Sequence, residues 1–188
     1  MDSETMIRFI YLGNLLIEKG PLVLLESCRI LQERNIPFHC HIVGAPTAEI
    51  STQDIAIMVA QHGLSNVVSI HGALYGEEKD YLLQQADAMV FPTFYSNECF
   101  PLVLLEGMKH SLALISTSEG AISDIIEEGV SGFLVEKQNA KALAKAMQKL
   151  AEEPSLTRKM GEAGRAHYLR MYSEESFIER LSSILRNA

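Results

Sequence analysis

The sequence predicts an α/β domain in which a mostly parallel, six-stranded sheet carries helices on both faces. Short apolar runs alternate with longer amphipathic stretches along the chain, which is the pattern of repeated strand–helix–strand units. The 188 residues are 47% hydrophobic, and this composition allows one domain with a sizeable core.

The first half of the chain is expected to form four strands and three helices. The predicted strands are the apolar runs 8–13, 38–44, 67–72 and 88–92, and the predicted helices are 21–34, 51–63 and 77–86. Pro21 suits the first position of a helix. Ser51 and Asp54 form a Ser-x-x-Asp start and Gly63 supplies a stop, so both ends of the second helix are marked.

The second half adds two strands and a series of helices. The predicted strands are 112–117 and 132–135, and the predicted helices are one that begins at Pro101 and those at 122–129, 139–153, 155–168 and 173–186. Asn139 is the expected N-terminal cap of the amphipathic helix that follows it. This order is typical of a Rossmann-like, doubly wound domain with extra C-terminal helices.

Composition argues against several classes of protein. The chain has 16 basic and 24 acidic residues and a formal net charge of −8, so no broad basic face can form for nucleic acid. Its three cysteines lack CxxC spacing, which favours free thiols in a reducing compartment. No basic leader and no apolar run of about 18 residues occurs. We therefore expect a cytoplasmic protein, and attachment to the inner face of a membrane through a missing domain stays open.

The candidate ligand site follows from the predicted topology. Ligands of doubly wound sheets bind beyond the carboxyl ends of the strands, where the loops are 13–20, 44–46, 71–76 and 92–100. The helix after the last loop has free backbone amides in its first turn, which attract a phosphate. We expect Phe100, Leu102 and Val103 to supply these amides, with Pro101 among them. Lys19 would add a full positive charge in the same crevice.

Two glutamates lie on either side of this helix start. Glu98 lies in the loop before the helix and is expected to face the ligand. Glu106 lies in the apolar run LVLLEGM, where burial of a carboxylate costs several kcal/mol unless donors satisfy it. We therefore expect Glu106 to be buried against a vicinal diol, backbone amides or a cation. A nucleotide ribose supplies such a diol.

Glu98 and Glu106, in ECFPLVLLE, resemble the paired-glutamate signature of the retaining, nucleotide-sugar-dependent glycosyltransferases of family 4, the group 1 family with GT-B architecture. Further similar stretches follow the family's order: YLGNLLIEKGP, HCHIVGAP, AMVFPTFYSNECFP and GVSGFLVEKQNAKALAKAMQKL. The resemblance covers residues 7–172. It implies that 1–188 is a single nucleotide-sugar-binding domain, one half of a GT-B enzyme of polysaccharide biosynthesis. The acceptor would be a glycan, a lipid or a small molecule.

The resemblance also implies roles for individual residues. Glu106 would accept hydrogen bonds from the ribose, and Glu98 would face the donor sugar near its reacting carbon. Lys19 would neutralise the diphosphate leaving group, where preorganised charge stabilises a transition state. Gly13 and Asn14 lie in the entry loop for the nucleotide. With this charge in place we expect no metal and no cofactor, and the sequence has no Asp-x-Asp pair to hold a cation.

The sequence departs from the family pattern in three places. Asn14 stands where the family commonly has an arginine, so it brings a donor without a charge. The stretch HSLALISTSEGAISD at 110–124 lacks the usual Gly-Pro landmarks. Only the second of two domains is matched. We therefore expect weak nucleotide-sugar binding, little or no transfer by the isolated chain, and a final helix from Ser173 that crosses toward the missing N-terminal acceptor domain.

Other candidate residues and functions stay open at this point. His71 is placed to reach the base or phosphate, although a loop histidine bound by backbone fits equally well. Cys99 has no base at a suitable spacing, so we expect it to pack. Alternative functions are a nucleotide-sugar epimerase or phosphorylase, and a non-catalytic nucleotide-binding or receiver-like module. The receiver alternative is weakened because Leu12, Gly13 and Asn14 stand where an acidic pair would be.

Overall fold

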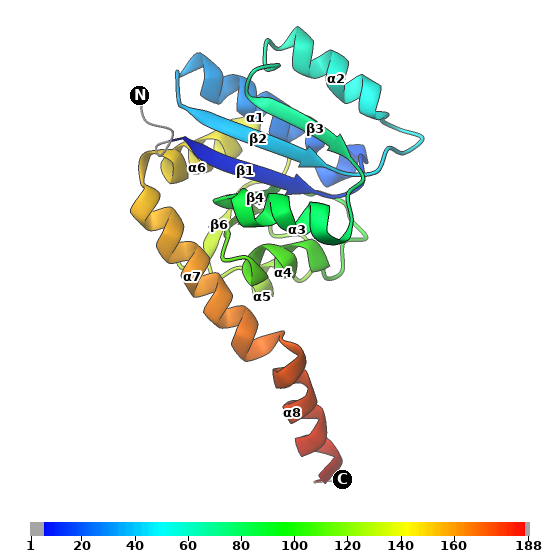
Figure 1. Cartoon of the computed structure of the whole chain (residues 1–188), viewed down its shortest axis with the longest axis vertical. Coiled ribbons are helices and arrows are strands. Elements are labelled where there is room, and N and C mark those ends of the chain that lie inside the picture. Colours follow the sequence, from blue (N-terminus) through cyan, green and yellow to red (C-terminus); the bar gives the residue numbers. More distant parts are fainter. Residues whose placement is uncertain (1–5, 187–188) are drawn as a thin grey trace.

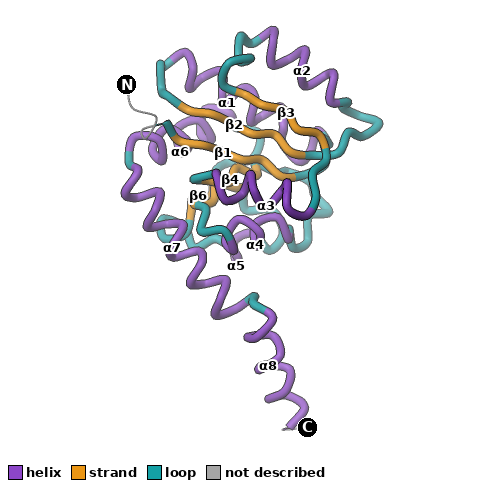
Figure 2. Tube along the Cα trace, viewed as in Figure 1, coloured by secondary structure: helices purple, strands orange, loops and turns teal. Residues whose placement is uncertain are grey.

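The strands predicted from apolar runs form one parallel sheet in the order β3-β2-β1-β4-β5-β6. Figures 1 and 2 show this sheet in a computed structural model that describes residues 6–186. The strands are β1 (Ile7–Leu12), β2 (Phe38–Val43), β3 (Val68–Gly72), β4 (Ala88–Phe91), β5 (Ala113–Ser116) and β6 (Gly132–Leu134). The predicted doubly wound class is therefore confirmed. The order reverses between β1 and β4, which places a ligand crevice at their carboxyl ends.

Helices cover both faces of the sheet. They are α1 (Pro21–Glu33), α2 (Thr52–Gln61), α3 (Gly76–Gln85), α4 (Leu102–Lys109), α5 (Ile122–Ile125), α6 (Ala140–Glu152), α7 (Pro154–Met171) and α8 (Glu174–Arg186), with a short 3-10 helix η1 at Ile17–Lys19. Helices α1, α2 and α6 lie on one face, and α3, α4 and α7 lie on the other. Helix α8 extends away from the body of the domain (Figure 1).

Local sequence signals explain several helix ends. Ser51 and Asp54 form the predicted capping box at the start of α2. Asn139 caps α6 as predicted, because its side chain accepts a hydrogen bond from the amide of Ala142 at 2.9 Å. These two helices therefore begin where side chains in the sequence satisfy their free amides.

Several helices differ from the prediction in their bounds, and α4 and the helix after β5 are two examples. Pro101 is not the first residue of α4 but the residue before it, since its ψ of 104° is extended, and Leu102 is the first helical residue. The helix predicted at 122–129 ends at Ile125. Gly129, with a φ of +75°, then turns the chain into β6. Neither difference changes the order of the elements.

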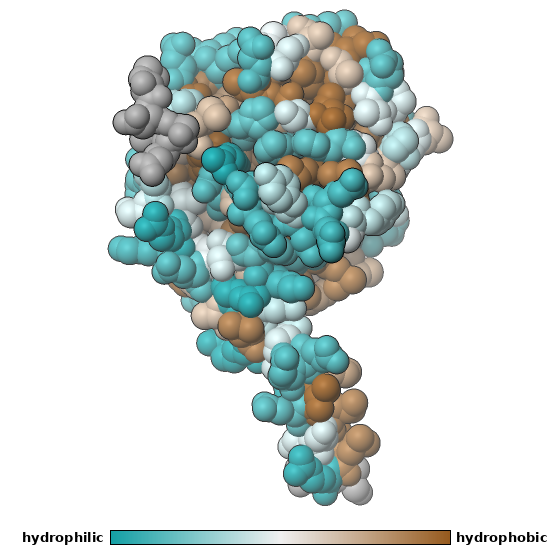
Figure 3. Space-filling model, viewed as in Figure 1, coloured by the Kyte–Doolittle hydropathy of each residue, from teal (hydrophilic) through white to brown (hydrophobic). Residues whose placement is uncertain are grey.

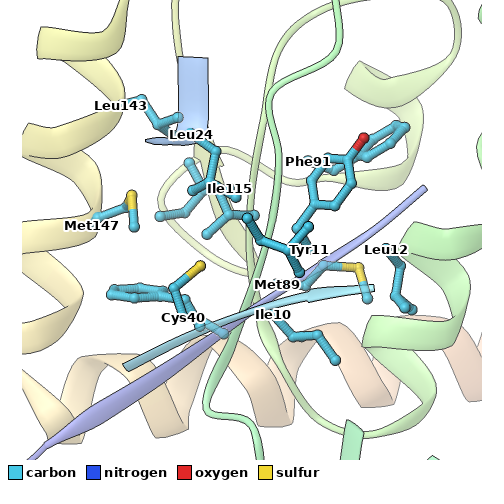
Figure 4. Close-up of a cluster of buried hydrophobic side chains, with 14 of the residues drawn as sticks. Ile10, Tyr11, Leu12, Leu24, Cys40, Met89, Phe91, Ile115, Leu143 and Met147 are labelled. Atoms are coloured by element: carbon cyan, nitrogen blue, oxygen red, sulfur yellow. The ribbon is translucent and has the colours of Figure 1, made fainter. Parts of the chain in front are cut away.

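The core lies between the central strands and the helices on both faces. Figure 4 shows part of it, with side chains from β1, β4 and β5 packed together. The rings of Tyr11 and Phe91, on neighbouring strands, have centres 6.2 Å apart. Tyr11 is fully buried, but it lies near the carboxyl end of β1. The core therefore brings one polar atom, the Tyr11 hydroxyl, to the edge of the sheet where ligands bind.

Candidate functional site

Lys19 and Glu98, from the loops after β1 and β4, form an ion pair. The Lys19 Nζ atom lies 2.5 Å from the Glu98 Oε2 atom, and the two side chains are only 18% and 9% exposed. The Lys19 ammonium also lies 5.5 Å and 5.0 Å from the ring centres of Phe91 and Tyr95, whose faces attract a cation. Lys19 and Glu98, for which the sequence predicts separate roles, therefore lie together in one enclosed place.

The loop that carries Lys19 closes tightly on the loop after β4. Gly20 has a φ of +82°, and a Cβ atom on it would lie 2.2 Å from the carbonyl oxygen of Pro92. Only glycine permits this backbone conformation together with this close approach. The amide of Phe94 also donates to the carbonyl of Glu18 at 2.7 Å. The ion pair therefore rests on a fixed junction between the two loops.

A further loop packs against the backbone of Glu98. Gly120, after β5, has a φ of +53°, and a Cβ atom on it would lie 1.8 Å from the Glu98 carbonyl oxygen. The amide of Ala121 donates to the carbonyl of Cys99 at 2.9 Å. The main chain of Glu98 is thus held from one direction while its carboxylate binds Lys19.

Two hydroxyl groups lie near the Glu98 carboxylate. The Thr93 Oγ1 atom is 3.5 Å from Glu98 Oε2, and the Tyr11 hydroxyl donates to the carbonyl of Asn14 at 3.2 Å. Burial, with a smaller contribution from the negative charge of Glu98, raises the pKa of Tyr11 well above its usual value. The Tyr11 hydroxyl therefore stays protonated. The sequence pattern did not identify Tyr11, because a tyrosine in an apolar strand is indistinguishable from a core residue.

Glu106 lines a separate cavity of about 120 Å³ beyond the ends of the first three strands. The cavity is lined by Leu12, Gly13, Asn14, Val43, Gly44, Ala45, Ala73, Leu74, Tyr75, Lys79, Val103 and Glu106. The Glu106 Oε2 atom lies 2.5 Å from the Lys79 Nζ atom, and the side chains are 34% and 26% exposed. The expectation that Glu106 is buried is therefore wrong. Its charge is met by a cation from α3 that the sequence did not reveal, since Lys79 looks like one member of a solvated EEKD start.

The first turn of α4, which follows the loop after β4, has free backbone amides. No side chain caps this helix, and its first backbone hydrogen bond runs from the Leu104 amide to the Pro101 carbonyl at 3.1 Å. The amides of Leu102 and Val103 come before that bond and have no earlier helical carbonyl. Phe100 is 40% exposed and precedes them in the loop. The predicted role of Phe100 to Val103, including Pro101, in binding a phosphate stays a prediction.

His71 and Cys99 lie in other surroundings. The His71 Nε2 atom is 2.9 Å from the Nδ1 atom of His41 on β2, and His71 is not among the residues that line the Glu106 cavity. Burial lowers the pKa of His71 and lowers that of His41 to about 4. Cys99 is exposed, while Cys28 and Cys40 are buried. The expectation that Cys99 packs into the fold is therefore wrong.

The site combines two lysine–glutamate pairs with an uncapped helix start. An ammonium has three donors, and a carboxylate has a second oxygen, so each pair keeps hydrogen-bonding capacity for a ligand. In a chain of net charge −8, each of the two lysines is balanced by its glutamate, so the amides at the start of α4 provide the remaining positive potential for an anion. Within residues 6–186, no three His, Cys, Asp or Glu side chains gather as a metal site.

Comparison with known proteins identifies relatives of this chain. Residues 3–167 match the family model described as Glycosyl transferases group 1. The chain is 30% identical over 172 residues to the O-antigen chain mannosyltransferase C of Escherichia coli, with 91% of this chain and 44% of that protein covered. It is 31% identical over 166 residues to the D-rhamnosyltransferase WbpZ of Pseudomonas aeruginosa, with 88% and 41% covered. The chain thus spans less than half the length of these relatives.

Solved structures show the same fold. The C-terminal domain of a glycosyl transferase group 1 family protein, LpcC from Francisella tularensis, superposes with a TM-score of 0.79 at 21% identity, with 89% of this chain and 87% of that chain covered. Anabaena Alr3699/HepE in complex with UDP-glucose superposes with a TM-score of 0.82 at 16% identity, with 97% and 49% covered. No helix within residues 6–186 has the length and apolar character needed to span a bilayer.

Proposed function

This chain belongs to the group 1 glycosyl transferases, and we propose that it is the donor-binding half of a retaining enzyme that transfers a hexose from a nucleotide-diphosphate sugar. Its sheet corresponds to one half of a GT-B fold. The extent of the match supports the proposal, because the chain covers 87% of an isolated C-terminal domain but only 49% of a solved structure that holds UDP-glucose. The family match weighs against the epimerase-like and receiver-like alternatives.

The Glu106 cavity is the proposed site for the nucleoside. The ribose diol would donate to the Glu106 carboxylate oxygen that Lys79 leaves free, since one ammonium occupies only part of its capacity. Gly13 and Asn14 line the same cavity from the loop after β1. The partial exposure of Glu106 suits this role, because a ligand replaces water without requiring a charged side chain to become buried first.

The diphosphate would lie between Lys19 and the first turn of α4. As the bond between the sugar carbon and the phosphate oxygen breaks, its electron pair passes to the diphosphate. An acceptor hydroxyl oxygen bonds to the same carbon and gives up its proton to the diphosphate. The Lys19 ammonium and the amides of Leu102 and Val103 then stabilise the new charge. We propose that this positive charge makes a divalent metal unnecessary. Glu98, paired to Lys19 at 2.5 Å, would orient that lysine and face the donor sugar.

The acceptor would be held by an N-terminal domain outside this chain. Helix α8 supports this part of the proposal, since its exposed apolar residues lie along one side (Figure 3). These residues are Phe177, Ile178, Leu181, Ile184 and Leu185. We propose that this side of α8 packs against the N-terminal domain, and that the isolated chain binds the donor weakly and transfers little or no sugar.

The single observation that carries the proposal is the juxtaposition of Glu106, Lys79 and the loop after β1 around one cavity. Calorimetric titration with UDP, GDP and ADP, and with their sugars, tests it. We expect saturable binding of one nucleotide series, and about a tenfold loss of affinity in Glu106→Ala. Glu162→Ala, an exposed glutamate on α7, is the matched control. Absence of binding by all three series would overturn the donor role, and unchanged affinity in Glu106→Ala would overturn the ribose assignment.

A further inference from the structure

Helix α7 holds the carboxyl end of α4 in place by two contacts. The Arg165 guanidinium donates to the carbonyl of Lys109, the last residue of α4, at 2.6 Å. A Cβ atom on Gly161 would lie 1.9 Å from the carbonyl oxygen of Ser111, so α7 lies directly against the turn that follows α4. The middle of α7 is therefore fixed relative to α4 by a charged hydrogen bond and a backbone contact.

The end of α7 reaches the opposite, amino end of α4. Tyr172, which follows the last residue of α7, packs edge-on against Phe100 with ring centres 5.8 Å apart. His167, five residues earlier on α7, stacks on Tyr172 with ring centres 5.5 Å apart and planes 15° apart. Edge-on and stacked aromatic pairs are both favourable geometries. Tyr172 is thus held in place by its own helix while it contacts the loop before α4.

The hydroxyl of Tyr172 connects this contact to a second loop. It donates to the carbonyl of Asp124 in α5 at 3.3 Å. Helix α5 directly follows Gly120 and Ala121, which pack against Glu98 and bind the Cys99 carbonyl. Tyr172 therefore contacts both the segment that contains Glu98, through Phe100, and the segment that packs against it, through Asp124.

We infer that Tyr172 is a positioning residue that holds residues 98–100 and the amino end of α4 in the arrangement needed for the diphosphate and sugar of the donor. This inference rests on the proposed function for its ligand, but its geometry does not depend on a ligand. A loop that must be ordered on binding lowers affinity, whereas a loop that is already fixed does not. Tyr172 is suited to this task because its ring has few rotatable bonds and its neighbours in α7 are anchored.

Hydrogen exchange of the Ala121 amide, followed by NMR, tests the positioning role without any nucleotide. This amide donates to the Cys99 carbonyl at 2.9 Å, so it exchanges only when the two segments that Tyr172 contacts move apart. We expect Tyr172→Ala to raise the Ala121 exchange rate about threefold to tenfold, the range that loss of an aromatic pair allows. Tyr172→Phe keeps the ring and is expected to stay within about twofold of the natural chain. Tyr81→Ala, which removes an exposed tyrosine of α3, is the matched control.

The amides of the paired strands β1 and β2 report unfolding in the same experiment, because they exchange only when the sheet opens. If Tyr172→Ala unfolds the domain and exposes them, Phe100→Ala breaks the contact from its exposed side. In a Phe100→Ala/Tyr172→Ala double variant the Ala121 amide should then exchange no faster than in the faster single variant. The positioning role is overturned if Tyr172→Ala, with the β1 and β2 amides protected, leaves the Ala121 exchange rate unchanged.

Titration with a nucleoside monophosphate, a diphosphate and a nucleotide sugar of the series that binds gives a second readout. We expect Tyr172→Ala to leave monophosphate affinity unchanged and to weaken the diphosphate and the nucleotide sugar about threefold to tenfold. Equal weakening of all three would overturn the inference while keeping the proposed function. Faster Ala121 exchange without binding of any nucleotide would support the positioning role and overturn the proposed function alone.

Discussion

The two lysine–glutamate pairs share one chemistry and one separation, 2.5 Å, but they differ in their surroundings. Lys19 and Glu98 come from two loops and are 18% and 9% exposed, while Lys79 and Glu106 come from two helices and are 26% and 34% exposed. When a charged pair is withdrawn from water, each charge depends on its partner for stabilisation. An exposed pair contributes little to the free energy of unfolding. We therefore expect the first pair to matter for stability and the second for ligand binding.

Removing one member of the enclosed pair, Lys19 and Glu98, should give the largest loss of stability. In Glu98→Ala the Lys19 ammonium stays largely buried without its carboxylate, and we expect a loss of about 3 kcal/mol in the free energy of unfolding. Urea unfolding followed by circular dichroism measures it. A Lys19→Met/Glu98→Ala double variant should recover part of the loss, because no unpaired charge remains. Losses of similar size in Glu98→Ala and Glu106→Ala would remove the contrast between the pairs.

A substitution of Gly120, whose backbone packs against Glu98, should give the next largest loss of stability. Gly120→Ala places a methyl group against the Glu98 carbonyl oxygen at a positive φ, and we expect a loss of about 2 kcal/mol in stability. Gly129→Ala is a matched control, since Gly129 also has a positive φ, +75°, but its added methyl group would meet nothing within 4 Å. The difference between the two variants isolates the contact with Glu98. Equal losses would mean that the backbone conformation alone is responsible.

Acid sensitivity should arise away from both pairs, at His41 on β2. Burial first, then the charges of His39, His71 and Arg8, lowers the pKa of His41 to about 4. Between the ordinary histidine pKa and this value the unfolded chain binds a proton that the folded chain does not. Stability therefore falls as the pH falls from about 6.5 to about 4, by on the order of 1 kcal/mol because the ring is partly solvated.

Replacing His41 by glutamine tests this assignment. Thermal unfolding between about pH 4 and about pH 7 should show a weaker dependence on pH in His41→Gln than in the natural chain. Identical pH dependence in the two proteins would place the acid-sensitive groups elsewhere, for example at His39 or His71, whose pKa values burial also lowers.

The smallest change in stability is expected at the exposed pair. Lys79→Met should lower the free energy of unfolding by no more than about 0.5 kcal/mol, because water screens the pair. The same variant should alter nucleotide affinity, since Lys79 orients the carboxylate proposed to bind ribose. Calorimetry on Lys79→Met beside Lys145→Met, an exposed lysine of α6, measures this. A loss of stability as large as that of Glu98→Ala would contradict the contrast drawn from exposure.

The sequence predicts best what depends on neighbouring residues. The capping box of Ser51 and Asp54 and the cap at Asn139 are local, so α2 and α6 begin where expected. The six strands and the doubly wound class also follow from apolar runs and general rules for parallel sheets. The candidate site at the carboxyl edge follows from that class, and so the loops that carry Lys19 and Glu98 and the helix that carries Glu106 could be chosen from the sequence alone.

What the sequence did not show depends on contacts between distant segments. Lys79 meets Glu106 only because α3 and α4 lie on the same face of the sheet. Glu106 lies in an apolar run, yet its side chain is partly exposed, because not every position on a short helix faces the core. Tyr172, at the end of α7, contacts Phe100 in the loop before α4. No spacing or composition near these residues signals such contacts.

The central place of β1 in the sheet has a consequence for folding. Strand β1 pairs with β2, its neighbour in sequence, and with β4, much further along the chain. The contact between Lys19 and Glu98 spans 79 residues and joins the loops that follow β1 and β4. Contacts of such long sequence separation are costly in chain entropy and form slowly. We expect the strands β1 to β3 and β4 to β6 to form as two early units, so that the enclosed charge pair appears only when they dock.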